Sequence, residues 1–189
     1  MNDFPGLSNQ FLIAMPALGD PNFHRTVTLV CEHNAEGALG IVINRPLDMR
    51  LGDILGQLEL ELDDCDNAIA GREVLMGGPV SQERGFVLHR PGQEWDATVR
   101  ISDDIGLTTS RDILEAMADG SGPSEALVAL GYAGWTAGQL DAEMAANAWL
   151  SVPATPEIVF DTPYQERWHR AARLVGVDID QLGNAAGHA

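Results

Sequence analysis

The feature that most constrains the fold is a row of short apolar runs in the first half of the chain, each closed by turn-forming residues. The runs at 11–15, 26–31 and 38–44 are separated by the sequences GDPNF and HNAEG. Short runs rich in β-branched and aromatic residues, bounded by glycine, proline and asparagine, are typical of strands joined by tight turns. The three runs between residues 11 and 44 are therefore predicted to form a hairpin meander.

Helical spacing enters near the middle of the chain and becomes frequent in its second half. Leucine and isoleucine at positions 51, 54, 55 and 58 predict a helix over 51–60. We expect further helices at about 110–119, 137–147 and 163–175, and further strands at 74–76, 85–89, 98–101, 126–132 and 158–160. Strands that come first and alternate with helices later predict one α+β domain over residues 1–189, with a mixed sheet.

The charge of the chain excludes several classes of function. It has 28 acidic and 11 basic residues, a formal net charge of −17, and every basic residue is an arginine. Without lysine there is no Schiff-base chemistry and no P-loop lysine. A strongly negative protein is also repelled by nucleic-acid phosphates and by anionic membranes. We therefore expect no membrane association, and direct nucleic-acid binding is disfavoured.

The N-terminus and the two cysteines indicate the compartment. The sequence MNDFPGLSNQ has neither a basic region nor an apolar core, so no signal peptide is predicted. Cys31 lies in an apolar run and is expected to be a buried core thiol, whereas Cys65 lies among acidic residues that disfavour a thiolate. Two such unlike, widely spaced thiols do not suggest a disulfide framework, so a cytoplasmic (cytosolic) protein is predicted.

The stretch LMGGPVSQERGFVLHR at 75–90 raises the question of a phosphate-binding loop. Such a loop needs a helix after its glycines, but here another apolar, strand-like run follows. Gly77 and Gly78 are instead predicted to permit a tight turn or a close approach of two backbones. Arg84 and His89 could face a pocket, although a single histidine on a strand is more often a hydrogen-bonded structural residue.

Two further sequences combine polar or aromatic residues with turns. In NRP at 44–46, Asn44 and Arg45 could hold a carboxylate or phosphate, or could lock a strand end. In GYAGW at 131–135, the aromatic side chains could line a ligand pocket or pack in the core. The residues predicted for a binding groove are Asn44, Arg45, Gly77, Gly78, Arg84, His89, Tyr132 and Trp135.

Motifs for catalysis and metal binding are missing from the sequence. There is no G-x-S-x-G elbow, no H-E-x-x-H and no Cys/His ligand spacing, so no metal and no cofactor are predicted. The acidic stretch at 59–66 lacks the glycine and terminal glutamate of a calcium loop and is expected to be solvated. One alternative stays open, a hydrolase-like enzyme in which folding brings together His33, His89 and a carboxylate.

A second alternative is a regulator that contacts nucleic acid directly. The predicted helix at 163–175 carries the densest basic patch of the chain, formed by Arg167, Arg170 and Arg173. Arginines near the end of a helix also suit the helix dipole, which explains the patch without a ligand.

Five groups of motifs, spread over most of the chain, point to one family. FLIAMP with DPNF, EHNAEGALGIVINRP, GGPV with RGFVLH, GYAGW with GQL, and NAWL follow one another between about residues 11 and 175. In these the chain resembles the AlgH/YqgE family of bacterial proteins. The resemblance implies a bifurcated β-sheet partly closed into a barrel-like core, flanked by helices, and a bacterial cytosolic protein. It implies no reaction, because the family is largely uncharacterised; some members carry a transcriptional-regulator label.

Composition and resemblance together favour a non-enzymatic binding or regulatory protein. The chain shows no helix-turn-helix signature and no lysine, which argues against direct contact with DNA. An indirect regulator that binds a protein partner or a small effector fits these observations better.

Overall fold

The computed structural model describes residues 6–16, 18–62 and 67–185. Its strands are β1 (Gln10–Ala14), β2 (Val27–Asn34), β3 (Gly37–Val42), β4 (Pro46–Arg50), β5 (Glu73–Met76), β6 (Val80–His89), β7 (Thr98–Arg100), β8 (Gly106–Thr108), β9 (Ala126–Thr136) and β10 (Trp149–Pro153). Its helices are α1 (Leu51–Gln57), α2 (Asn67–Ala70), α3 (Asp112–Asp119), α4 (Gln139–Ala145), the π-helix η1 (Glu157–Asp161), α5 (Tyr164–Leu174) and α6 (Ile179–Ala185).

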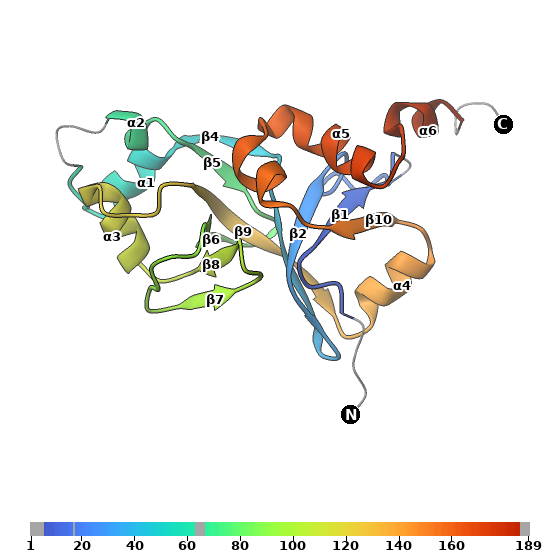
Figure 1. Cartoon of the computed structure of the whole chain (residues 1–189), viewed down its shortest axis with the longest axis horizontal. Coiled ribbons are helices and arrows are strands. Elements are labelled where there is room, and N and C mark those ends of the chain that lie inside the picture. The colour runs from blue at the N-terminus through green and yellow to red at the C-terminus, as the bar shows by residue number, and fades with distance from the viewer. Residues whose placement is uncertain (1–5, 17, 63–66, 186–189) are drawn as a thin grey trace.

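The long strand β9 organises the sheet (Figure 1). The strand order is β10-β1-β2-β3-β9-β6-β8-β7, and β4 and β5 form a branch that joins at β9. The first half of β9 lies between β5, which is parallel to it, and β6, which is antiparallel, whereas its second half pairs with β3. The sheet is therefore mixed and bifurcated, and it curls into a half-barrel flanked by helices. The predicted α+β fold is confirmed.

Alternation along the strands sends side chains to opposite faces of this sheet. In β1, Phe11 and Ile13 enter one core cluster, while Leu12 and Ala14 enter another. The first cluster also contains Trp168 of α5, so α5 covers this face. The period of two in strands explains why a single short run supplies both layers.

The opposite face of the sheet is covered by different helices at its two ends. At one end α4 contributes Leu140 to a cluster with Trp135 and Trp149. At the other end α1 and α3 contribute Leu55 and Ile113 to a cluster over β5, β6 and β9. Figure 1 shows α1 and α3 together at one end of the molecule and α4 at the other.

Several predicted boundaries needed correction. The meander of β1, β2 and β3 is confirmed, but α1 ends at Gln57, where a helix to 60 was expected. The prediction of a strand at 158–160 is wrong, because this segment belongs to the π-helix η1. There Ile158 and Val159 pack in the core and the Thr162 hydroxyl donates to the Glu157 carbonyl. Periodicity alone does not separate a short apolar strand from a short buried helix.

The strands β6 and β9 are longer than the runs that predicted them. β6 begins at Val80 and β9 continues to Thr136, so the turn joining β5 to β6 comprises only 77–79. Five elements had no counterpart in the sequence prediction, namely β4, β8, β10, α2 and α6.

Cys31 is buried, as predicted, and desolvation followed by the nearby Glu32 carboxylate raises the pKa of its thiol to about 12. Cys65 and the last part of the acidic stretch at 59–66 lie outside the described residues. Among the residues that are described, no helix combines the length and apolar character that crossing a bilayer requires.

Candidate functional site

The NRP sequence locks a loop to the end of a strand. The Asn44 side chain accepts a hydrogen bond from the backbone N–H of Val27 at 2.9 Å and donates one to the Arg25 carbonyl at 2.9 Å. The Arg45 guanidinium donates to the carbonyls of Asn22 and His24, at 2.6 and 2.9 Å. Desolvation lowers the pKa of Arg45, although Asp20 opposes that shift. Both side chains are thus engaged by the loop before β2.

The glycines of GGPV and GYAGW lie where two backbones cross. A Cβ atom at Gly78 would lie 2.1 Å from the backbone carbon of Tyr132, and one at Gly77 would lie 2.3 Å from the Gly131 oxygen. Gly131 has a φ of +78°, a left-handed conformation that favours glycine. The predicted close approach of backbones is therefore present, and it marks the point where the sheet divides.

Arg84 and Tyr132 contact the same buried ring, Phe86, beside this crossing. The Arg84 guanidinium lies 5.4 Å from the centre of the Phe86 ring, and the Tyr132 ring contacts Phe86 edge-on at 5.7 Å. Tyr132 and Trp135 also line an open groove of about 480 Å³ beside the β2–β3 hairpin, together with Glu32, Asn34, Glu36, Gly37, Ala38, Leu39, Val80, Gly134 and Thr136.

Three of the motifs by which the chain resembles its family, DPNF, GYAGW and NAWL, contribute to one aromatic cluster. Phe23 of DPNF stacks on Trp135 of GYAGW at 6.2 Å and meets Trp149 of NAWL edge-on at 5.4 Å. The Glu143 carboxylate accepts both indole N–H groups, at 2.8 Å from Trp135 and 3.1 Å from Trp149. Since the polar atoms of these rings are satisfied and both indoles are buried, the cluster stabilises the fold.

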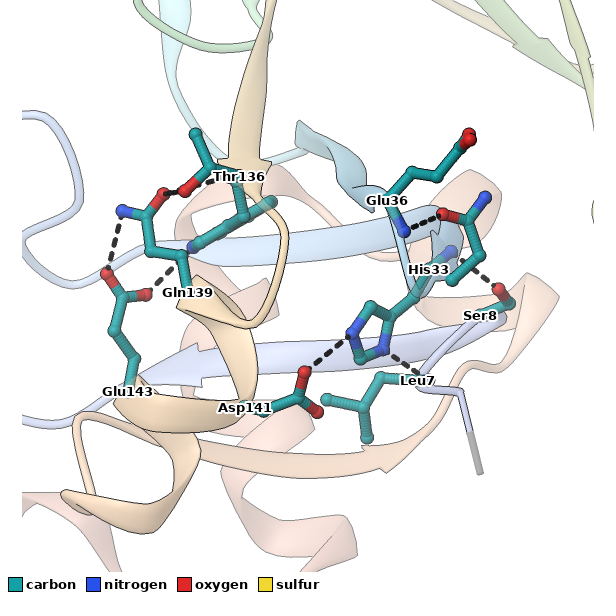
Figure 2. A network of polar contacts seen from close by, with 10 residues as sticks. Leu7, Ser8, His33, Glu36, Thr136, Gln139, Asp141 and Glu143 are labelled. Carbon is teal, nitrogen blue, oxygen red and sulfur yellow. Dashed lines mark hydrogen bonds and ion pairs between the residues drawn. The ribbon is translucent and has the colours of Figure 1, made fainter. Parts of the chain in front are cut away.

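His33 connects three parts of the chain (Figure 2). Its Nδ1 accepts the backbone N–H of Leu7 at 2.9 Å, so in the neutral ring Nε2 carries the proton and faces the Asp141 carboxylate at 3.5 Å. The hydroxyl of Ser8 accepts the backbone N–H of His33 at 2.9 Å. Both ring nitrogens are therefore occupied, and His33 ties the N-terminal segment to β2 and α4.

His89 lies at the far end of β6 with different partners. Its Nδ1 donates to the Arg90 carbonyl at 2.9 Å, and its Nε2 lies 2.7 Å from the Thr108 hydroxyl, which lies 2.8 Å from the Thr98 hydroxyl. The side chain is buried. His33 contacts Leu7 and Asp141, whereas His89 contacts Arg90 and Thr108. Across the described ranges no three His, Cys, Asp or Glu side chains are grouped as a metal site would require.

The three arginines of the predicted basic patch do not share one surface. Arg167 is buried and donates to the carbonyls of Thr162 and Ile43. Desolvation lowers its pKa to about 10, despite the opposing effect of Glu73, so it stays cationic at neutral pH. Arg170 and Arg173 are both exposed on α5, and Arg170 pairs with Glu166 at 3.1 Å.

A cavity of about 350 Å³ lies at the other end of β9, between α1 and α3. Its floor is formed by strand residues, namely Gly85, Val87, Val128 and Leu130. Its walls are formed by the apolar side chains of Met49 in β4, Ile54 in α1, Leu58 directly after α1, and Leu114 in α3. Its polar lining consists of Gln57, Glu83, Thr108, Thr109, Ser110 and Arg111. Apolar walls with a few polar groups are typical of small-molecule sites.

The polar groups around this cavity fall into two kinds. Ser110 and Arg111 are engaged, because Ser110 donates to Asp112 at 2.5 Å and Arg111 donates to the Leu58 carbonyl at 2.8 Å. By contrast, no described residue forms a hydrogen bond with the side chains of Gln57, Glu83 or Thr109. These three groups are thus available to a ligand.

The sequence reasoning missed this cavity, although one signal pointed to it. Alternation along the strand places His89, Val87 and Gly85 on one face, and continuing the period of two adds Glu83. An acid on the apolar face of a strand marks a polar site. The helices that enclose it are distant in sequence and carry no recognisable motif.

Of the predicted groove residues, Gly77 and Gly78 pack against the backbone of 131–132, Arg84 and Tyr132 meet at the Phe86 ring, and Tyr132 and Trp135 line the open groove. Asn44 and Arg45 face the loop before β2, and His89 lies at the opposite end of β6.

The comparisons with known proteins agree with this architecture. The AlgH-like family model matches residues 11–180. A UPF0301 protein of Nitrosococcus oceani is 56 % identical over 181 residues, covering 96 % of each chain. Another, of Saccharophagus degradans, is 53 % identical over 187 residues, covering 99 % of this chain and 91 % of the relative.

Two solved structures share the fold. The solution structure of the AlgH protein from Pseudomonas aeruginosa has a TM-score of 0.79 and 46 % identity, covering 100 % of this chain and 99 % of that one. A crystal structure of a protein from Corynebacterium diphtheriae has a TM-score of 0.74 at 19 % identity, covering 97 % and 94 %, and supports the fold alone. Because the family match spans the strands that build the sheet and both ends of β9, this chain belongs to the AlgH-like family.

Proposed function

We propose that this chain is a non-enzymatic binding protein that takes a small, largely apolar effector into the cavity between α1 and α3. The observation that carries the proposal is an apolar cavity of about 350 Å³ with polar side chains at its rim that form no hydrogen bond with a described residue. Each methylene group of a ligand that leaves water for such a cavity contributes about 0.8 kcal/mol. An apolar body therefore supplies affinity, and the rim supplies orientation.

Binding is favoured over catalysis by the state of the histidines. In His33, one ring nitrogen accepts a backbone N–H and the other faces a carboxylate. In His89, both nitrogens are engaged inside the protein. A general base needs a free lone pair within reach of the substrate proton. Neither ring offers one, which supports the non-enzymatic proposal over a hydrolase.

A regulatory role belongs to the same proposal, as an indirect one. The chain would act in the cytosol on a protein partner, according to whether the effector occupies the cavity. Direct contact with nucleic acid is not proposed, because Arg167 points inward, Arg170 pairs with Glu166 and the net charge is −17.

The test is calorimetric titration with octanol as a neutral apolar probe. Gly85 lies on the cavity floor, and a Cβ atom built there meets nothing within 4 Å, so Gly85→Leu places a side chain in the cavity. Gly56→Leu is the matched control, because Gly56 also has open space at its Cβ position but lies on the exposed side of α1.

We expect octanol to bind the unaltered chain and the Gly56→Leu variant. It should not bind Gly85→Leu, although that variant should keep the circular-dichroism spectrum of the unaltered chain. Absence of octanol binding to the unaltered chain, or equal binding to Gly85→Leu, would refute the cavity as the site.

A further inference from the structure

We propose, resting on the function above, that the cavity selects amphiphiles that carry a protonated amine and discriminates against carboxylates. Glu83 is the origin of this preference. It lines the cavity, its side chain is exposed at the rim, and no described arginine or histidine forms an ion pair with it. An unpaired carboxylate beside an apolar cavity attracts a cation and repels an anion.

Arg111 lines the same cavity and would be the natural partner of an anionic ligand. Its Nε is paired with the Glu115 carboxylate at 3.1 Å, and its Nη2 donates to the Leu58 carbonyl at 2.8 Å. A carboxylate ligand would have to compete with Glu115 for this guanidinium. Arg111 therefore adds little positive potential at the rim, because its charge is already matched.

The other nearby arginines are also directed elsewhere. Arg84 follows Glu83 in β6, but its guanidinium lies over the Phe86 ring on the opposite face of the strand. Arg50, at the end of β4, pairs with Glu73 at 3.1 Å. Alternation in the strand thus leaves Glu83 facing the cavity without its neighbouring cation.

The neutral polar groups of the rim suit the same headgroup. An alkylammonium has three N–H donors and no acceptor. Besides the Glu83 carboxylate, the rim offers the Gln57 side-chain carbonyl and the Thr109 hydroxyl as acceptors, and neither is used by another described residue. The net charge of −17 adds an attractive field for any cation that approaches.

The experiment compares octylamine, octanol and octanoate, which share the chain and differ in the headgroup, by calorimetric titration at neutral pH and low salt. Octylamine is cationic and octanoate anionic under these conditions. The proteins are the unaltered chain, Glu83→Gln, and Glu36→Gln as the control. Glu36 is an exposed carboxylate on the turn between β2 and β3, in the open groove and away from the cavity.

We expect octylamine to bind about threefold to fivefold more tightly than octanol, the range of an exposed ion pair, and octanoate to bind most weakly. Glu83→Gln should remove the preference for the amine, whereas Glu36→Gln should keep it.

This inference would be overturned if octanoate bound as tightly as octylamine, or if the preference for the amine survived Glu83→Gln. In either case, octanol binding would still support the cavity as a binding site. If none of the three probes bound, the proposed function itself would fail.

Discussion

The two halves of β9 treat their polar neighbours in opposite ways. Around 133–136, Glu143 accepts two indole N–H groups and Gln139 accepts the backbone N–H of Thr136. Around 126–130, Glu83 and Thr109 face a cavity, and their side chains make no hydrogen bond with a described residue. The same strand therefore has a closed end, where the polar side chains are hydrogen-bonded within the protein, and an open end, where they are left to solvent or a ligand.

This difference separates residues that define the family from residues that could bind a ligand. The motif residues Phe23, Trp135 and Trp149 belong to the closed end, where they pack on one another. Buried polar groups with complete partners stabilise a fold, whereas a polar group left without a partner beside an apolar cavity is the usual mark of a site. The aromatic motif residues of this chain thus stabilise the fold and do not mark a ligand site.

The crossing between the two ends should be the most sensitive position. Gly78→Ala places a Cβ atom 2.1 Å from the Tyr132 backbone, and both backbones are held by sheet hydrogen bonds. We expect destabilisation of more than about 4 kcal/mol, measured by urea unfolding, or failure to fold. Gly56→Ala, where a Cβ meets nothing within 4 Å, should be neutral or slightly stabilising. A Gly78→Ala protein of normal stability would break the account of the crossing.

Two arginine substitutions, one buried and one at the cavity rim, should differ in their effect on the free energy of unfolding. Arg167→Ala removes a buried cation that donates to the carbonyls of Thr162 and Ile43, and should lower the free energy of unfolding by about 3 kcal/mol. Arg111→Ala removes exposed contacts at the cavity rim and should cost less than about 1 kcal/mol. Urea titrations of both variants test this, and equal losses would contradict the contrast between a buried, hydrogen-bonded arginine and an arginine at the exposed rim of the cavity.

The same substitution can be made in a carboxylate at each end of β9. Glu143→Leu leaves the indole N–H groups of Trp135 and Trp149 without their acceptor and should cost about 2 kcal/mol. Glu83→Leu removes no side-chain hydrogen bond to a residue that the structure describes, and should change stability by less than about 0.5 kcal/mol. Thermal unfolding followed by tryptophan fluorescence measures both. Should the Glu83 variant be the less stable one, the comparison would be reversed.

The smallest effect concerns pH and the segment that leads into α3. Desolvation raises the pKa of Asp112, but hydrogen bonds from the Ser110 hydroxyl and from the backbone N–H groups of Asp96 and Ile113 outweigh it, so the net pKa is lowered. A lowered folded-state pKa contributes stability above the unfolded value of about 4, and this is lost as pH falls through the folded value.

Asp112→Asn should therefore be modestly less stable than the unaltered chain at neutral pH, and the two stabilities should converge on acidification below about pH 4. Urea unfolding at several pH values checks this. A stability difference that stayed constant down to strong acid would show that the Asp112 charge has no part in it.

Much of the fold could be predicted because it is local. Alternation and turn residues specify β1, β2 and β3 from neighbouring positions, and Gly77 and Gly78 predicted a tight turn or a close approach of backbones. The strand β10 was missed, because its pairing with β1 joins segments far apart in the chain. The π-helix at 157–161 was missed because a short apolar run fits strand and helix equally.

The candidate site was harder to predict for the same physical reason. Asn44 and Arg45 have the chemistry of ligand-binding residues, but the fold presents them to backbone groups of a loop about twenty positions earlier. The cavity needs α1, β6 and α3 to meet, and nothing in the sequence of any one of them specifies that meeting. Long-range packing decides which polar groups are satisfied and which are left open.

The most direct test of the division along β9 is to map a bound probe by amide NMR, using octanol and the unaltered chain. The account predicts that chemical-shift changes concentrate at Glu83, Val87, Thr109 and Leu114, while the indole N–H signals of Trp135 and Trp149 do not move. Changes centred on those two indoles and on Thr136, with the cavity residues unaffected, would contradict it.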